Sequence, residues 1–239
     1  MKKFDKTPTT LTKEPIAMTG AVVGFKYKDG VILAADTQGS YGSMARFKNI
    51  TRIHRVAPTT AMASGGELSD FQEIKRILDE KHEHDLIQDD GTLFYQPHDY
   101  AHFLARKHYQ RRNKGDPLWN NTVMGGVSST GEKYLAVMDL FGNIIEGDHH
   151  VTGTGHYFCN VLIANNWRED MSFEEAKELV DNCFRVLFYR DKTMTEHIQI
   201  CAVTKDGVNV SEPYTIQGKW DYEAFVKNTN ERVRDMLVR

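Results

Sequence analysis

The sequence predicts an α+β fold built on antiparallel sheets, and three local patterns lead to this prediction. Two apolar runs, 21–28 and 31–35, flank Asp29-Gly30, a dipeptide typical of a two-residue antiparallel hairpin turn. Two segments with apolar residues at helical spacing follow, and a second pair of helices comes after further strands. The predicted order is hairpins, two helices, hairpins, two helices and a final hairpin. This order favours helices packed over antiparallel sheets.

The first half of the chain supplies a second pair of strands and the first pair of helices. Residues 51–56 and 60–63 are the strand candidates. A helix follows from Leu68, because apolar residues recur there at helical spacing. The next helix opens at Gln96-Pro97, since proline is favoured in the first turn. The stripes that these two helices should bury are Leu68, Phe71, Ile74, Ile77 and Leu78 in the first, and Tyr100, Phe103, Leu104 and Tyr109 in the second.

The second half repeats this arrangement. Alternating polarity and turn residues predict three antiparallel strands, at 122–127, 134–138 and 144–146. A glycine turn at 153–155 leads into the third helix. Ser172 and Glu175 form a capping box that begins a long fourth helix, which ends near residue 191. The last hairpin pairs residues 197–203 with 208–211 around Asp206-Gly207.

Composition excludes several function classes. A net charge of -3 and a pI near 6.4 give no electrostatic basis for binding nucleic acid. The basic stretch 106–114 is therefore interpreted as the solvated or partner-facing end of the second helix. No apolar run reaches the ~20 residues that cross a bilayer, so no membrane partner is expected. Three widely separated cysteines indicate free thiols in a reducing compartment.

The histidines do not predict a metal site. The pairs His82/His84 and His149/His150 have neither the spacing nor the additional ligands of a metal centre. Gly153 and Gly155 are not followed by the lysine of a phosphate loop, so we interpret them as a tight turn. We expect no metal and no cofactor.

Asp36 is the first candidate for chemistry, because it directly follows an apolar strand. A buried carboxylate without a partner costs several kcal/mol, so Asp36 must be hydrogen-bonded or charge-paired. The residue is either a strand-end turn aspartate or part of a functional site. The local pattern leaves both interpretations open.

Three motifs connect the chain with a known family. The hairpin ending in Ala34-Ala35-Asp36, the stretch 39–49 and Asp116-Pro-Leu-Trp-Asn120 resemble the beta-type subunits of the proteasome core particle, and in particular a non-catalytic subunit type. The resemblance covers roughly residues 9–220 and implies the N-terminal-nucleophile hydrolase fold, a four-layer α/β/β/α sandwich of two antiparallel sheets. It also implies a place among alpha and beta subunits in a stacked-ring hetero-oligomer of the cytoplasm and nucleus.

The resemblance also implies which site residues are missing. In active family members a threonine nucleophile lies sixteen residues before the aspartate and a lysine sixteen residues after it. Counted from Asp36, these positions hold Gly20 and Arg52. A guanidinium stays protonated and cannot exchange protons as a lysine can. The chain is therefore expected to have kept the fold and lost the chemistry.

Two further positions follow from the same resemblance. Gly65 corresponds to the glycine whose N–H stabilises the oxyanion in active members. Asp191 is retained, but Met194 stands where active members have a serine that holds the threonine amine. A thioether cannot donate a hydrogen bond. We predict no catalytic, cofactor-binding or metal-binding residue.

An active threonine peptidase is the alternative. Thr19 would be its nucleophile, and Thr10 a weaker choice, once cleavage freed the amine. A shift of one residue along a strand turns a side chain to the other face, which argues against Thr19.

The expected organisation has three parts: an N-terminal arm or propeptide at 1–19, trimmed before Thr9 or Thr10, a beta-type domain at 20–218, and a C-terminal extension at 219–239. The resemblance implies that this extension contacts the opposite beta ring.

Overall fold

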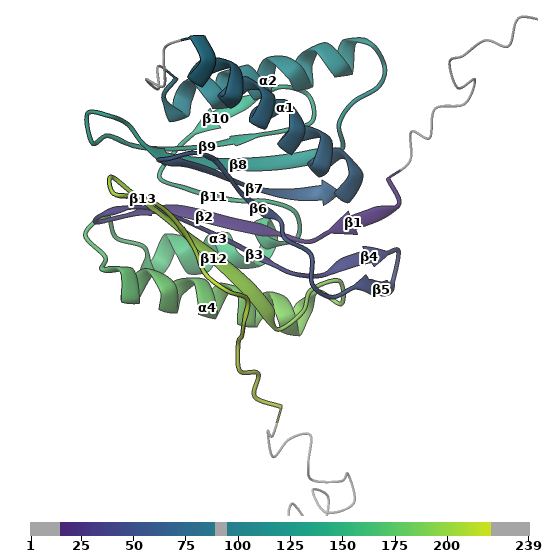
Figure 1. Cartoon of the computed structure of the whole chain (residues 1–239). Helices are drawn as coiled ribbons and strands as arrows, with labels where there is room; N and C mark the ends of the chain where they lie inside the picture. The colour runs from purple at the N-terminus through teal and green to yellow at the C-terminus, as the bar shows by residue number, and fades with distance from the viewer. Residues whose placement is uncertain (1–14, 89–94, 221–239) are drawn as a thin grey trace, which may run out of the picture.

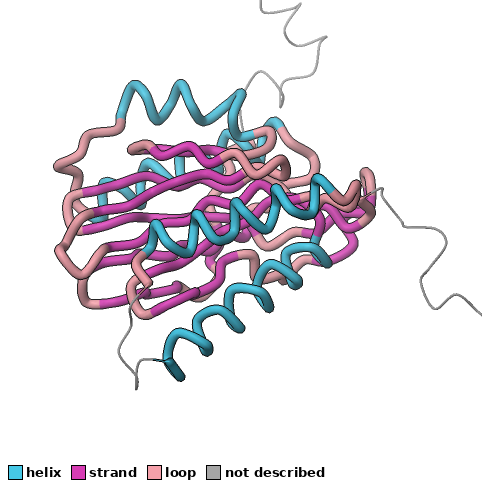
Figure 2. Tube along the Cα trace, turned by 90° about the horizontal axis from the view of Figure 1, so that it is seen from above, coloured by secondary structure: helices cyan, strands magenta, loops and turns pink. Residues whose placement is uncertain are grey.

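A computed structural model describes residues 15–88 and 95–220. Two antiparallel sheets lie face to face, and a pair of helices covers the outer surface of each, as Figure 1 shows. Seen from above, the helices of the outer layers lie over the strands and run roughly along them (Figure 2). The predicted α/β/β/α sandwich of two antiparallel sheets is confirmed. Within the described ranges, no helix combines the length and apolar character needed to cross a membrane.

The larger sheet has eight strands. Its hydrogen-bonded order is β10-β9-β8-β7-β1-β4-β5, and β6 pairs with β7 beside this path. The bounds are β1 Ala17–Thr19, β4 Gly39–Tyr41, β5 Met44–Phe47, β6 Ile53–Ala57, β7 Thr60–Glu67, β8 Asn120–Val127, β9 Lys133–Met138 and β10 Ile144–Glu146. The strand pairs predicted at 51–63 and 122–146 all lie in this sheet.

The smaller sheet has six strands in the order β11-β2-β3-β12-β13, with β14 paired to β12. Its bounds are β2 Val22–Tyr27, β3 Gly30–Asp36, β11 His149–Val151, β12 His197–Thr204, β13 Gly207–Val210 and β14 Tyr214–Thr215. The first and last predicted hairpins, β2–β3 and β12–β13, lie side by side because β3 pairs with β12.

Four helices form the outer layers. Their bounds are α1 Leu68–Gln88, α2 Pro97–Asn113, α3 Gly155–Asn166 and α4 Phe173–Arg190. The predicted starts are confirmed at α2, which has proline in its first turn, and at α4, where Ser172 and Glu175 form the capping box. Helices α1 and α2 cover the larger sheet, and α3 and α4 cover the smaller one (Figure 1).

Three apolar layers hold the sandwich together, and the alternation of side chains along the strands creates them. On β3, Val31 and Leu33 point into the layer between the sheets, while Ile32 and Ala34 point toward α3 and α4. Because both faces of β3 are covered, its seven residues are all buried. This explains why the strand reads as a continuous apolar run.

The first hairpin turn differs from the prediction by one residue. Tyr27 pairs with Gly30, so the two loop residues are Lys28 and Asp29, not Asp29-Gly30. Gly30 is a strand residue, and a Cβ added to it would lie 1.9 Å from the carbonyl oxygen of Val203 on β12. The glycine is needed for this close approach of strands rather than for the turn.

Several short strands were not predicted: β1, β4, β5, β11 and β14. Residues 17–19, within the predicted arm, form β1 between β7 and β4. Its N-terminal side is held by Glu67, whose Oε2 accepts hydrogen bonds from the backbone N–H groups of Ile16 (2.6 Å) and Ala17 (2.9 Å). The rest of the arm, 1–14, and the extension beyond residue 220 lie outside the described residues.

Candidate functional site

The predicted site residues meet where the chain crosses from one sheet to the other. Gly20 links β1 of the larger sheet to β2 of the smaller one. Asp36 is the last residue of β3, and Arg52 directly precedes β6. Met194 lies between α4 and β12. A Cβ added to Gly20 would have Met194, Asp36 and Arg52 as its three nearest side chains.

Asp36 and Arg52 form a buried ion pair. Asp36 Oδ1 lies 2.8 Å from Arg52 Nη1, and the two side chains are 0% and 1% exposed. Asp36 Oδ2 also accepts a hydrogen bond from the Gln38 N–H at 3.2 Å. The Arg52 guanidinium also donates a hydrogen bond, through Nη2, to the carbonyl oxygen of Ala21. The pair therefore connects β2, β3 and the approach to β6, and it meets the predicted need of Asp36 for a partner.

Burial dominates the electrostatics of this pair. It raises the pKa of Asp36 to about 6, against the opposing effect of the Arg52 charge and of hydrogen bonds from Gln38 and Thr195. Burial likewise lowers the pKa of Arg52, while Asp36 opposes that change. A permanently protonated guanidinium provides a counter-ion for Asp36 but no proton acceptor.

Met194 occupies the space that a side chain at Gly20 would need. Its Sδ would lie 2.2 Å from a Cβ on Gly20, with Asp36 Oδ1 at 3.3 Å and Arg52 Nη1 at 3.6 Å. Met194 is buried, at 5% exposure, and packs in the core beneath α3 and α4. The position directed at the ion pair thus carries no hydroxyl or thiol and is filled by a thioether.

The two other predicted residues, Gly65 and Asp191, are also close to this point. A Cβ on Gly65 would lie 2.5 Å from the Gly20 carbonyl oxygen, so the two backbones are in contact. Asp191 ends α4 and accepts hydrogen bonds from the hydroxyls of Thr154 and Thr193 and from the Thr193 N–H. Burial alone would raise the pKa of Asp191, but these hydrogen bonds outweigh it and leave the pKa below its ordinary value.

Thr19 points away from the ion pair. Its hydroxyl donates to the Gly66 carbonyl at 2.9 Å and accepts from the Gly66 N–H at 3.1 Å. This follows from the alternation of side chains along a strand, since Gly20 is directed at Asp36 and its neighbour is not. Thr9 and Thr10 lie outside the described residues.

Three residues of this region were not identified from the sequence. Gln38 connects the ion pair to the α4–β12 loop, because its Nε2 donates to the Thr193 carbonyl at 2.9 Å. Thr152 holds the start of β2 by accepting from the Val22 N–H at 3.0 Å. Thr193 binds Asp191, as above. No sequence motif marks these threonine and glutamine residues as part of a site, so their contacts become visible only in the tertiary structure.

The part of the chain that the structure describes holds no group of three or more side chains suited to bind a metal ion. The histidine pairs take other roles. His82 Nδ1 lies 3.0 Å from the hydroxyl of Tyr100, and His149 packs against the ring of Trp167. The three cysteines are free and buried.

Comparison with known proteins agrees with this geometry. The family model described as proteasome subunit matches residues 17–203. The chain is 41% identical to the proteasome subunit beta type-4 of Arabidopsis thaliana, over 93% of this chain and 90% of the relative. It is 37% identical to the beta type-4 subunit of Xenopus laevis, over 90% and 88%. It is 31% identical to the beta type-7 subunit of Saccharomyces cerevisiae, over 92% and 87%. The chain therefore belongs to the proteasome subunit family, as a beta-type subunit of the core particle.

Proposed function

We propose that this beta subunit is a non-catalytic, structural member of the core particle, which fills a place in the beta ring and helps to enclose the proteolytic chamber during protein degradation. One observation carries the proposal. At Gly20, the position directed at Asp36 and Arg52, there is no nucleophile, and Met194 fills the space. Covalent catalysis needs a nucleophile within reach of a base, and this position offers neither.

The proposed partners are the other alpha and beta subunits of the same particle. Large apolar side chains on the outer face of α3 support a role in assembly, since Tyr157 is 79% exposed and Val161 is 63% exposed. The proposed location is the cytoplasm and nucleus. Buried thiols at Cys159, Cys183 and Cys201 fit such a reducing compartment.

The C-terminal extension is proposed to contact the opposite beta ring. Only its first residues are described: Trp220 packs edge-on against Tyr189, with ring centroids 4.8 Å apart, and the Lys219 N–H donates to the Tyr189 hydroxyl at 2.5 Å. These contacts hold the first residues of the extension against Tyr189 near the end of α4. They support a tail that starts from a defined point on the surface of the domain.

An active threonine endopeptidase using Thr19 is the competing function. Two features argue against it. The Thr19 hydroxyl is held by both polar groups of the Gly66 backbone, and β1 is paired with strands on both sides. Freeing the Thr19 amine would require removal of Met18, which pairs with Ser40 and Glu67.

The deciding experiment combines N-terminal sequencing of the mature chain with labelling by a threonine-directed covalent probe in intact particles. Catalytic subunits of the same particles serve as the positive control for the probe. We expect an N-terminus upstream of Thr19 and no label on this chain. A chain that begins at Thr19 and takes up the probe would overturn the proposal.

A further inference from the structure

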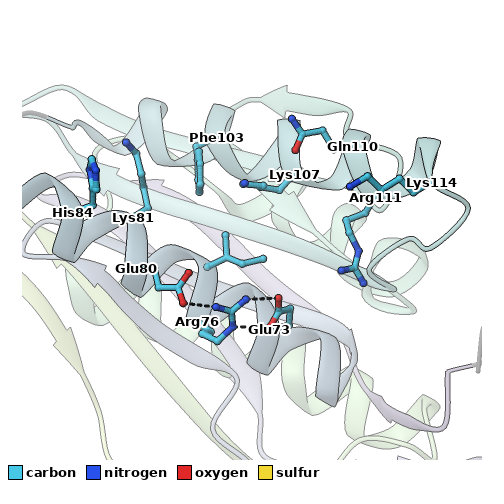
Figure 3. A pocket seen from close by; sticks show the side chains of 11 residues that line it. Glu73, Arg76, Glu80, Lys81, His84, Phe103, Lys107, Gln110, Arg111 and Lys114 are labelled. Atoms are coloured by element: carbon cyan, nitrogen blue, oxygen red, sulfur yellow. Dashed lines mark hydrogen bonds and ion pairs between the residues drawn. The ribbon is translucent and has the colours of Figure 1, made fainter. Parts of the chain in front are cut away.

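A groove between the two helices of the outer layer on the larger sheet carries an excess of positive charge. It has a volume of about 520 Å³, and side chains from α1 and α2 line it from both sides (Figure 3). Five lysine and arginine side chains but only two carboxylates line the groove: Arg76, Lys81, Lys107, Arg111 and Lys114, with Glu73 and Glu80. The chain as a whole has a net charge of -3, so the charge of this groove is opposite in sign to that of the whole chain.

The two carboxylates of the groove share one cation within α1. Arg76 Nη2 lies 2.7 Å from Glu73, and the same guanidinium also bonds Glu80, as the dashed lines in Figure 3 show. Arg111 is paired as well, at 2.8 Å from Asp116 Oδ2. Arg76 balances one of the two carboxylates and Arg111 balances Asp116, so one negative charge is left against the three lysines of the groove.

Lys81, Lys107 and Lys114 have no ion-pair partner among the described carboxylates. Instead, two of the ammonium groups lie over aromatic rings. Lys81 Nζ is 3.6 Å from the Tyr95 ring centroid and 5.7 Å from that of Phe103, while Lys107 Nζ is 5.1 Å from the same Phe103 ring. Two like charges therefore share one ring, and an anion in the groove would relieve their repulsion.

A second surface groove, along α4, differs in charge. Four carboxylates line it, Glu174, Glu175, Glu178 and Asp181, together with two basic side chains, Lys177 and Arg185. The two grooves therefore carry charge excesses of opposite sign, which favours different partners at the two places.

We propose that the α1/α2 groove is a docking site for an acidic polypeptide segment of a neighbouring subunit. Lys107 and Lys114 are two helical turns apart, about 10 Å along α2, so a single small anion cannot contact both. An extended or helical segment with spaced Asp or Glu residues can, and Phe103 gives it an apolar contact. This inference rests on the proposed role as an assembly subunit.

A photo-cross-linking amino acid at Gln110, which lines the groove, tests the proposal in intact particles. The same substitution at Glu178, in the groove along α4, is the matched control. We expect Gln110 to cross-link to a segment of another subunit that is rich in Asp or Glu, and Glu178 to reach a different segment. Cross-linking of Gln110 to a segment without acidic excess, or to no polypeptide, would overturn the proposal.

A charge-reversal variant gives an independent measurement. Lys81→Glu, Lys107→Glu and Lys114→Glu together should reduce incorporation into particles roughly tenfold at low salt, whereas the three Lys→Arg changes should leave it unchanged. Incorporation of the reversed variant at the normal level would contradict the docking site. If even the unmodified chain never co-purifies with other proteasome subunits, the assembly role itself fails, and the two failures are therefore distinguishable.

Discussion

Placing a threonine at Gly20 is the most direct perturbation of the candidate site. The structure predicts that Gly20→Thr neither restores a nucleophile nor fits without rearrangement. The new Cβ would lie 2.2 Å from Met194 Sδ, closer than non-bonded atoms approach, so the methionine must move. The α-amine that would act as base also remains in the peptide bond with Thr19.

The size of the effect follows from the packing. Inserting a side chain into a filled core costs about 1–3 kcal/mol. Methionine is flexible, so we expect a value of about 1–2 kcal/mol for Gly20→Thr. With Met194→Ser already in place, the obstructing thioether is gone and the same substitution should cost less than about 0.5 kcal/mol. The two positions should therefore be coupled by about 0.5–2 kcal/mol.

Urea unfolding of the full chain at low concentration, followed by tryptophan fluorescence, measures this coupling in a double-mutant cycle. Probe labelling of the same variants in particles measures chemistry. Only the triple change Gly20→Thr, Arg52→Lys and Met194→Ser, with the arm removed, is a fair test of recovered activity. Equal costs of Gly20→Thr in both backgrounds would show that Met194 does not fill the position, and label on Gly20→Thr alone would refute the importance of the other two residues.

Three further predictions follow from the structure. Arg52→Met leaves Asp36 buried without its counter-ion and should cost about 3–5 kcal/mol in urea unfolding, whereas Asp36→Leu with Arg52→Met should cost much less; equal costs would contradict the ion pair. Burial lowers the pKa of His108 to about 4, so the unfolded chain binds the proton more readily and stability falls by about 3 kcal/mol as pH drops from 6.5 to 4. His108→Leu should remove that part of the pH dependence, and identical pH profiles would exclude it. Deleting residues 225–239 should leave half-particles intact but slow their pairing in native gels; a normal yield of full particles would contradict the proposed contact of the extension with the opposite beta ring.

Local patterns were sufficient for the elements that bury a regular face. The hairpin β2–β3, the helix starts at Pro97 and Ser172 and the strand series of residues 120–146 depend on alternation, capping and turn chemistry, which neighbouring residues determine. The short strands escaped prediction for the opposite reason. β1 has only three residues, and it is a strand because β7 and β4 lie on either side of it. No local pattern identifies partners that are twenty or more residues away.

What is known of the candidate site also comes partly from the sequence and partly from the tertiary structure. The sequence by itself, through its resemblance to proteasome beta-type subunits, predicted that Gly20 and Arg52 stand where active members have their threonine and lysine. The same resemblance predicted that Met194, three residues after Asp191, stands where they have a serine. Only the tertiary structure decided what these replacements do together: the guanidinium neutralises Asp36, and the thioether fills the space beside Gly20. It also decided the role of Gly30, which the sequence assigned to a turn and which instead allows β12 to approach. These contacts join residues that are far apart in the sequence. They form only when the two sheets pack together, so the sequence alone does not reveal them.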